Sequence, residues 1–328
     1  MRIGLGLAAL SAVCPSARAA YQGFNYGAFF TDNTPKMQAD FEAEFKTAQN
    51  LVGAPGSGFT SARLYTMIQW GTPSTPISAI PAAIATNTTL LLGLWASAGD
   101  AGIASELAAL SAAVTTYGKA FTDLVVGISV GSEDLYRSSP TGKAHSAGAG
   151  SYPAALVGYI ERARDAIKST GLAGVPVGHV DTWTEWVDPA NQAVMDAVDW
   201  VGMDAYSYWQ SLVPNGAERG RALFEDALAR TRARVGGRPV WITETGFPVS
   251  GETSGEAVPS VENAKRFWDE VGCPLFGREN VWWYILRDAG RGRPVPSFGI
   301  VGEALGTTPV FDISCEAVEK EEESCDAA

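Results

Sequence analysis

The sequence predicts an α/β fold, a single (β/α)8 barrel of the TIM type, from two features of the chain. Eight short runs of apolar or aromatic residues recur at intervals of a few tens of residues, and segments with helical spacing lie between most of them. Alternating strands and helices form a parallel sheet, and eight such units close into a barrel of roughly 250 residues. No change of composition divides residues 21–312, so we expect one domain over residues 21–315.

The expected strands are rich in aliphatic and aromatic residues, which favour extended backbone. They cover Gly23–Ala28, Ser61–Thr66, Leu90–Ala96, Val125–Ser132, Val177–Trp183, Trp200–Tyr208, Val240–Thr243 and Val281–Arg287. The expected helices carry apolar residues with the period of an α-helix. They cover Phe41–Leu51, Ile103–Ala120, Tyr152–Ser169, Asn191–Ala197, Arg219–Val235 and Val261–Val271.

Two of the expected strands end on a glutamate. Because side chains alternate between the faces of a strand, the first of these two strands should have one small face and one bulky face. The small face would hold Gly127, Ser129, Gly131 and Glu133, and the bulky face Val126, Ile128 and Val130. Small residues suit a crowded barrel interior, so we expect the small face to point inward. In the second strand, Val240, Ile242 and Glu244 should share a face.

The two glutamates suggest acid–base chemistry. Active sites of such barrels lie at the C-terminal ends of the strands, where Glu133 and Glu244 would both stand. A retaining glycosidase holds two carboxyl groups about 5–5.5 Å apart, and an inverting one about 6.5–9.5 Å. The sequence does not give this distance. For either glutamate alone, a strand end that simply meets water is the alternative interpretation.

The composition argues against several other classes of protein. The chain carries a net charge of −12 and has a pI of about 4.7, so it should repel nucleic acids. His145 and His179 are too isolated to indicate a metal site, and no glycine-rich phosphate loop follows a strand. We therefore expect no metal, no cofactor and no nucleic-acid partner. We expect a monomer.

The two ends of the chain differ from the rest. Residues 1–20 combine an early Arg2, an apolar run and small residues at the end, which is typical of a secretory signal peptide, and a disordered tail is the alternative. Residues 316–328 are acidic and lack an apolar run, so we expect a disordered tail. They also lack the hydrophobic segment of a lipid-anchor signal. The expected product is a secreted chain without a membrane span.

Secretion bears on the cysteines and on one asparagine. Cys14 would leave with the signal peptide, which leaves three cysteines, an odd number. We expect a disulfide between Cys273 and Cys315, with Cys325 in the tail, although two reduced thiols are the alternative. Asn87-Thr88-Thr89 predicts an N-glycosylation site.

Several motifs resemble glycoside hydrolase family 17, in its fungal cell-wall branch of β-1,3-glucanases and glucanosyltransferases. The resemblance covers essentially the whole expected domain. Its motifs are Gly23-Phe24-Asn25-Tyr26-Gly27, Thr60-Ser61-Ala62-Arg63-Leu64-Tyr65, Leu92-Gly93-Leu94-Trp95, Val130-Gly131-Ser132-Glu133-Asp134-Leu135-Tyr136-Arg137 and Thr243-Glu244-Thr245-Gly246-Phe247-Pro248.

The resemblance implies a retaining mechanism on β-1,3-glucan. Glu244 matches the nucleophile of the family and Glu133 its acid/base. Two positions depart from the wider pattern, because Ser132 replaces an asparagine and Phe247 a tryptophan. The first departure is shared with the fungal branch, and the second could soften a contact with the sugar.

Further residues are candidates for binding substrate. Arg63 could pair with Glu244, or form an ordinary surface salt bridge. Each remaining candidate has a structural alternative, either core packing for the aromatic residues or solvation for the acids. The candidates for hydrogen bonding are Tyr26, Tyr206, Asp181, Asp204 and Asp288, and the candidates for stacking on sugars are Trp95, Trp183, Trp209 and Trp283.

Three functions remain open. The first is a secreted endo-1,3-β-glucanase that acts in cell-wall remodelling or glucan degradation. The second is a cell-wall β-1,3-glucanosyltransferase, which would use the same two glutamates but pass the sugar to another sugar. The third is a non-catalytic glucan-binding wall protein. The presence of both glutamates and their flanking residues disfavours the third.

Overall fold

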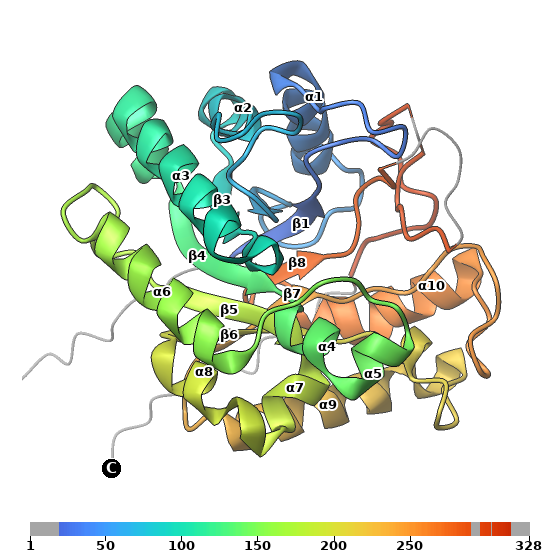
Figure 1. Ribbon diagram of the computed structural model, residues 1–328. Coiled ribbons are helices and arrows are strands. Elements are labelled where there is room, and N and C mark those ends of the chain that lie inside the picture. Colours follow the sequence, from blue (N-terminus) through green and yellow to red (C-terminus); the bar gives the residue numbers. More distant parts are fainter. Residues whose placement is uncertain (1–19, 290–295, 303, 316–328) are drawn as a thin grey trace, which may run out of the picture.

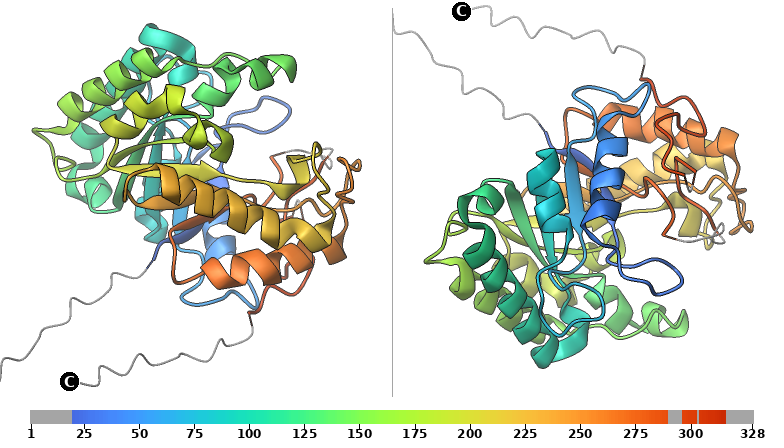
Figure 2. Two further views of the ribbon diagram at one scale, coloured as in Figure 1. Left: turned by 90° about the horizontal axis from the view of Figure 1, so that it is seen from below. Right: turned by 90° about the horizontal axis from the view of Figure 1, so that it is seen from above.

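The computed structural model describes residues 20–289, 296–302 and 304–315. Eight parallel strands, β1 to β8, pair in sequence order and close into a barrel, with the helices outside it (Figure 1). Views from above and below show the helices around the strands (Figure 2). The predicted fold class is confirmed. The predicted signal peptide, apart from Ala20, and the predicted acidic tail lie outside the described residues.

The strands are short, and most end before the predicted runs do. They are β1 Gln22–Tyr26, β2 Ser61–Leu64, β3 Thr89–Leu94, β4 Val125–Ser132, β5 Val177–Thr182, β6 Trp200–Asp204, β7 Val240–Glu244 and β8 Val281–Trp283. The residues beyond these ends form the loops at the C-terminal mouth of the barrel.

The helices include all six predicted segments, with shifted ends. The α-helices are α1 Gln38–Gln49, α2 Ala79–Thr86, α3 Gly99–Thr122, α4 Asp134–Ser138, α5 Pro140–Ala144, α6 Pro153–Ile167, α7 Trp183–Val187, α8 Gln192–Ala197, α9 Gly220–Arg234, α10 Val261–Phe267 and α11 Cys273–Leu275. Shorter helical turns are η1 Ala96–Ala98, η2 Pro189–Asn191, η3 Ser207–Trp209, η4 Ala217–Arg219 and η5 Trp268–Gly272. The prediction missed α2, in which Pro81 occupies the first turn, where a backbone N–H has no helical partner.

Tryptophans fill the barrel interior near the N-terminal ends of the strands. The rings of Trp200 and Trp241 stack with centroids 4.1 Å apart, and Trp282 packs beside them. A Cβ on Gly127 would approach Trp241 to 2.7 Å, and a Cβ on Gly178 would approach Trp200 to 2.3 Å. Glycines on neighbouring strands therefore make room for these rings, as the prediction of a small inward face requires.

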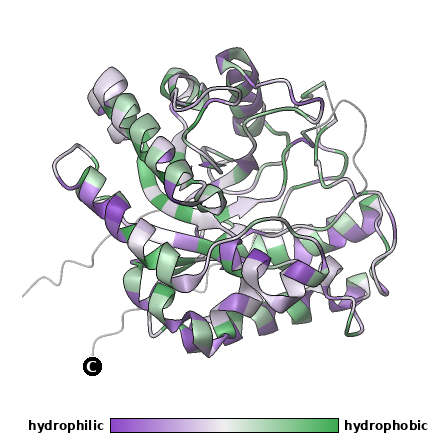
Figure 3. Ribbon diagram, viewed as in Figure 1, coloured by the Kyte–Doolittle hydropathy of each residue, from purple (hydrophilic) through white to green (hydrophobic). Residues whose placement is uncertain are grey.

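A second, larger core lies between the strands and the helices. Its buried side chains include Phe41 and Phe45 of α1, Ile103 of α3 and Leu156 of α6. Hydrophobic and hydrophilic residues alternate along the outer helices, whereas β4 is mostly hydrophobic (Figure 3). Such amphipathic helices bury one stripe against the barrel. Within the described ranges, no helix has the length and apolar composition needed to cross a membrane.

The C-terminal segment is fastened to the barrel by a disulfide. Cys273 and Cys315 are bonded, with Cα atoms 5.5 Å apart, so the predicted pairing is confirmed. Nearby, the indole of Trp268 donates a hydrogen bond to the carbonyl of Ile313. Asn87 is exposed at the end of α2, and its glycosylation stays a prediction.

The alternation predicted for β7 is wrong at its last residue. Met203 pairs with Ile242, but Asp204 pairs with Glu244, so β7 has one extra residue at Thr243. Ile242 faces the outer core, while Thr243 donates a hydrogen bond to Asp204 inside the barrel. The bulge turns Glu244 inward as well, where it meets Arg63.

Irregular pairing also changes the faces of β4. A shift between Leu90 and Leu91 of β3 turns Val126 toward the interior tryptophans, not toward the outer core with Ile128. A second irregularity follows Ser129 in the pairing with β5. There Gly131 has a φ of 87° and faces Asp134 and His179 outside the barrel. The predicted inward position of Gly131 is therefore wrong.

Candidate active site

A cleft with a volume of about 1050 Å³ lies over the C-terminal mouth of the barrel. Its lining comes from the loops that follow most of the strands. Both Glu133 and Glu244 belong to the lining. The two glutamates predicted from the sequence therefore face a common space.

Glu244 is surrounded by hydrogen-bond donors. Its Oε1 accepts hydrogen bonds from Arg63 Nη1 at 2.6 Å and from the Tyr65 hydroxyl at 2.8 Å. Its Oε2 accepts from the Tyr206 hydroxyl at 2.7 Å. Burial, followed by the charge of Glu244, raises the pKa of Tyr65 and of Tyr206 well above the ordinary value, so both phenols remain donors. Three side-chain donors therefore hold the carboxylate of Glu244 in place.

Arg63 is itself held by partners on three strands. It is 1% exposed and donates to Asn25 Oδ1 at 2.8 Å and to Ser132 Oγ at 2.9 Å. Asn25 in turn donates to the carbonyl of Thr243 at 3.0 Å. The guanidinium is therefore fixed before substrate binds, and so is the carboxylate of Glu244.

Glu133 occupies the sharp junction between β4 and α4. It precedes α4 with a φ of 55°, a left-handed conformation that is uncommon outside glycine and is found at functional sites. Arg137 lies one turn later, with Nη2 at 3.6 Å from Glu133 Oε2. Burial, followed by the charges of Glu244 and Asp181, raises the pKa of Glu133 to about 8. Glu133 is therefore protonated at neutral pH.

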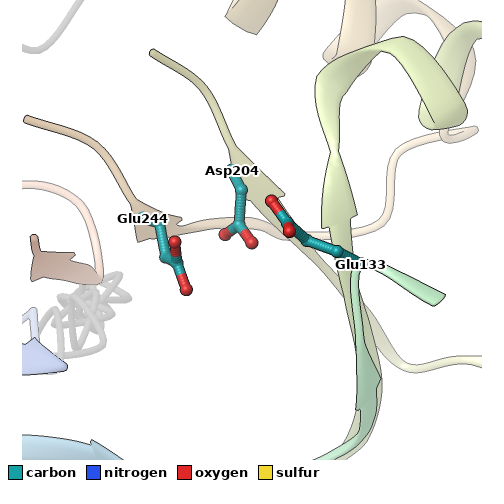
Figure 4. Close-up of side chains that lie close together, drawn as sticks. All are labelled: Glu133, Asp204 and Glu244. Carbon is teal, nitrogen blue, oxygen red and sulfur yellow. The ribbon is translucent and has the colours of Figure 1, made fainter. Parts of the chain in front are cut away.

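Asp204, the last residue of β6, lies between the two glutamates (Figure 4). One carboxylate oxygen from each of the three residues lies within 4.8 Å of the other two. Burial, followed by the charge of Glu244, raises the pKa of Asp204 well above its ordinary value. Three such oxygens could in geometry surround a cation. Arg63 already supplies positive charge to Glu244, one of the three residues.

Four predicted residues lie at or directly beneath the cleft. Trp95 and Trp209 line it, and the guanidinium of Arg137 stacks on Trp95 at 4.8 Å from the ring centroid. Tyr206 lines it while bonded to Glu244. Arg63 lies beneath the surface and contacts Glu244, as predicted, but it is too buried to contact a sugar directly.

Three predicted aromatic residues do not line the cleft. Tyr26 is 3% exposed and packs edge-on against Phe45. Trp283 is 2% exposed and packs against Trp268 at 4.8 Å. The guanidinium of Arg230 lies over the ring of Trp183, with its central carbon 5.0 Å from the ring centroid. The prediction that these three bind substrate is corrected, because packing against the helices turns Tyr26 and Trp283 away from the mouth of the barrel and Trp183 packs with α9.

Asp181 shapes the backbone of the site. Asp181 is fully buried and accepts hydrogen bonds from the backbone N–H groups of Leu135 and Tyr136, at 2.8 and 3.2 Å. These bonds fix the start of α4 directly after Glu133. The prediction that Asp181 binds sugar hydroxyls is therefore corrected to a role in positioning.

Asp288 has a similar role in a different loop. It accepts from Ser297 Oγ at 2.6 Å and from the N–H groups of Phe298 and Gly299, both at 3.0 Å. These bonds hold together two parts of the segment that follows β8. Here too, the prediction of hydroxyl binding is corrected, because the carboxylate is already occupied by the chain.

Several residues of the site were not predicted from the sequence. Tyr65 follows Arg63 by two residues, so the alternation of β2 could have placed both side chains on the face that meets Glu244. Phe29 and Trp70 lie in loops without regular periodicity, where no such signal exists. Tyr284 and Phe298, which also line the cleft, follow β8 where that strand ends early.

Comparisons with known proteins identify the family of the chain. Residues 23–290 match the family described as BtgE/BtgC glycoside hydrolase domain. A protein from Aspergillus fumigatus, named probable glucan endo-1,3-beta-glucosidase eglC, is 58% identical over 95% of this chain and 69% of its own length. A glucan 1,3-beta-glucosidase from Saccharomyces cerevisiae is 31% identical over 77% of this chain and 75% of its own length. The chain spans 63% to 69% of the length of the eglC relatives.

Solved structures show the same fold at low sequence identity. A glycoside hydrolase family 17 beta-1,3-glucanosyltransferase from Rhizomucor miehei has a TM-score of 0.71 at 22% identity, covering 90% of this chain and 98% of that one. An endo-laminarinase from Formosa has a TM-score of 0.65 at 12% identity, covering 86% of this chain and 83% of that one.

Proposed function

Because the chain belongs to the family of BtgE/BtgC glycoside hydrolase domains, we propose that it cleaves β-1,3-glucan internally, with retention of the anomeric configuration. The family match and the relatives also confirm the resemblance to glycoside hydrolase family 17 and the expectation of a glycosidase. The substrate is supported by the printed name of the fungal relatives, probable glucan endo-1,3-beta-glucosidase.

One observation carries the mechanism. Glu244 is held by three donors while Glu133 has a pKa of about 8, and an oxygen of each carboxyl lies within 4.8 Å of the other. A carboxyl group held by donors, beside one with a raised pKa, is what a nucleophile and a general acid require. The short separation favours retention, because inversion needs roughly 6.5–9.5 Å to admit a water molecule.

The reaction then proceeds in two displacements. Glu244 attacks the anomeric carbon while Glu133 gives its proton to the departing glycosidic oxygen, and a glycosyl-enzyme ester forms. Esterification removes the negative charge of Glu244, which is one of the causes that raise the pKa of Glu133. The pKa of Glu133 therefore falls, and Glu133 remains ionised after it has given up its proton. It then takes a proton from the incoming water, which releases the sugar and restores Glu244.

The products of a short linear β-1,3-gluco-oligosaccharide test the proposal. The wild-type protein should give shorter oligosaccharides, and Glu244→Gln should lose nearly all of this activity because the amide is a poor nucleophile. Full activity in Glu244→Gln, with the variant shown to be pure, would overturn the role of Glu244.

The same experiment separates hydrolysis from transfer to a second sugar. The cleft has aromatic residues on opposite sides of the glutamates, Trp70 after β2 and Trp209 after β6. An acceptor sugar can therefore pack against an aromatic ring on either side. Transfer predicts products longer than the starting oligosaccharide, together with shorter ones. Only shorter products would assign the chain as a hydrolase.

The proposed place of action is outside the cell, in the wall or the medium. The signal-like N-terminus supports this location, and so does the disulfide between Cys273 and Cys315, since such bonds persist in oxidising compartments. Recovery of the protein in the medium or wall fraction of an expressing fungal culture is the expected result. Retention in the cytosol would contradict it.

A further inference from the structure

Two aromatic side chains form an exposed pair on one side of the cleft. Phe29 is 36% exposed and Trp70 is 42% exposed, and both line the cleft. Their ring centroids lie 4.0 Å apart, with an angle of 32° between the planes. Neither ring belongs to the buried core, so packing of the fold does not account for their exposure.

The pair is held rigidly. The indole N–H of Trp70 donates to the carbonyl of Asn33 at 3.0 Å, which ties the loop after β2 to the loop after β1. The neighbouring Gln69 donates to the carbonyl of Lys36 at 2.9 Å. Lys36 is buried and pairs with Glu44 of α1 at 2.7 Å. Both loops therefore have fixed positions, and binding at this surface costs little ordering.

The position of the pair fits a chain that crosses the cleft. Trp70 follows β2 and Trp209 follows β6, four strands apart in a closed barrel of eight, so the two rings stand on opposite sides of the mouth. Glu133 follows β4 and Glu244 ends β7, so the glutamates lie between these two sides. Trp209 is also exposed, at 54%.

We propose that Phe29 and Trp70 form a remote subsite that binds glucose units of the glucan chain away from the bond that is cleaved. This inference rests on the proposed function. All hydroxyl groups of a β-linked glucose ring are equatorial, so each face of the ring presents C–H groups that pack on an aromatic surface. Apolar aromatic surface beside a polar catalytic centre is typical of ligand sites. The subsite makes cleavage more efficient for long chains than for short ones.

The test compares a long and a short linear β-1,3-gluco-oligosaccharide. In Trp70→Ala, the ratio of kcat/KM for the long substrate to kcat/KM for the short one should fall about tenfold, the equivalent of ~1.4 kcal/mol. Phe29→Leu should lower the same ratio and serves as a second variant that keeps an apolar side chain. The matched control is Trp183→Ala, which removes a tryptophan outside the cleft and should keep the ratio.

Binding without turnover gives an independent readout. In a Glu244→Gln background, addition of Trp70→Ala should weaken the Kd for the long oligosaccharide about tenfold, measured by calorimetry. An unchanged ratio and an unchanged Kd in both Trp70→Ala and Phe29→Leu would overturn the subsite alone. A wild-type protein that cleaves neither oligosaccharide would instead overturn the proposed function on which the subsite rests.

Discussion

At the scale of single residues, the site depends on two carboxyl groups with opposite surroundings. Glu244 has Arg63 and two phenols as donors, whereas Glu133 has a single guanidinium at 3.6 Å and lies among acids. Identical side chains therefore have different surroundings, and only those of Glu133 raise the pKa of its carboxyl group.

The protonation of Glu133 predicts the alkaline side of the pH profile. Its pKa is raised to about 8, so the acid form is present below that pH and is lost as the pH rises through it. The value of kcat/KM, which reports the free enzyme, should fall above about pH 8 by tenfold per pH unit. The measurement is kcat/KM on an oligosaccharide between neutral and alkaline pH.

Two variants provide the comparison for this pH profile. Glu133→Gln, assayed on an aryl glycoside whose leaving group needs no acid, should lack the alkaline decline. Glu185→Gln should keep it, although burial raises the pKa of Glu185 to about 7, because Glu185 does not line the cleft. If the alkaline decline persists in Glu133→Gln, a group other than Glu133 causes it.

Arg63 predicts a large effect of removing one charge. Arg63→Met leaves Glu244 buried without a cation and should cost about 3 kcal/mol of unfolding free energy, together with most of the activity. Lys119→Met breaks the exposed Lys119–Asp123 pair and should change the stability by less than about 1 kcal/mol. Urea unfolding of both variants measures the difference. Equal stabilities would show that the buried pair is not essential.

At the scale of elements, the end of β4 positions Glu133. Gly131 adopts a φ of 87°, and a Cβ there would meet Asp134 Oδ2 at 2.3 Å. Asp134 Oδ2 accepts a hydrogen bond from the N–H of Ser132, and Asp181 holds the start of α4. The turn therefore fixes Glu133 through contacts that leave no room for a larger residue.

This geometry predicts different outcomes for two glycines. Gly131→Ala and Gly148→Ala impose similar backbone strain, because Gly148 has a φ of 91°, but a Cβ on Gly148 would meet nothing within 4 Å. Both should lose roughly 1 kcal/mol of stability from the strain. Only Gly131→Ala should also lose activity, at least tenfold in kcat. Equal activities of the two variants would contradict the positioning role of the β4 turn.

At the scale of the whole molecule, the disulfide links two segments of the chain that do not line the cleft. It joins α11, which precedes β8, to the segment that ends at Cys315, so it lies toward the N-terminal end of the barrel. The bridge spans a sequence separation of 42 residues, and a loop of this length adds about 4 kcal/mol in the chain-entropy account.

Removal of the disulfide should therefore separate stability from activity. The double variant Cys273→Ala/Cys315→Ala should lose roughly 3–4 kcal/mol of unfolding free energy and therefore unfold at a lower temperature. Its kcat/KM at low temperature should equal that of the wild type, since neither cysteine lines the cleft. Thermal unfolding and a low-temperature assay check the two parts. A loss of activity without a change in stability would contradict this division.

The fold and the meeting of Glu133 and Glu244 at one cleft could be predicted because both depend on local pattern. Each strand is buried and therefore apolar, and each glutamate directly follows such a run. The direction of individual side chains could not be predicted, since the bulge at Thr243 reverses the alternation that places Glu244. Trp95 and Trp283 both stand at strand ends, yet only Trp95 reaches the cleft, because Trp283 packs against Trp268. Packing between segments that are distant in the sequence determines which side chains reach the cleft, and the periodicity of the sequence does not predict that packing.

The stereochemistry of cleavage tests the proposed roles of Glu244 and Glu133 directly. Proton nuclear magnetic resonance of a linear β-1,3-gluco-oligosaccharide, recorded during the first minutes of reaction, reports which anomer of the new reducing end forms first. Retention predicts the β-anomer first, with the α-anomer appearing later by mutarotation, and neither anomer with Glu244→Gln. The α-anomer first, or the same products from Glu244→Gln, would contradict the assignment of Glu244 as the nucleophile and Glu133 as the acid/base.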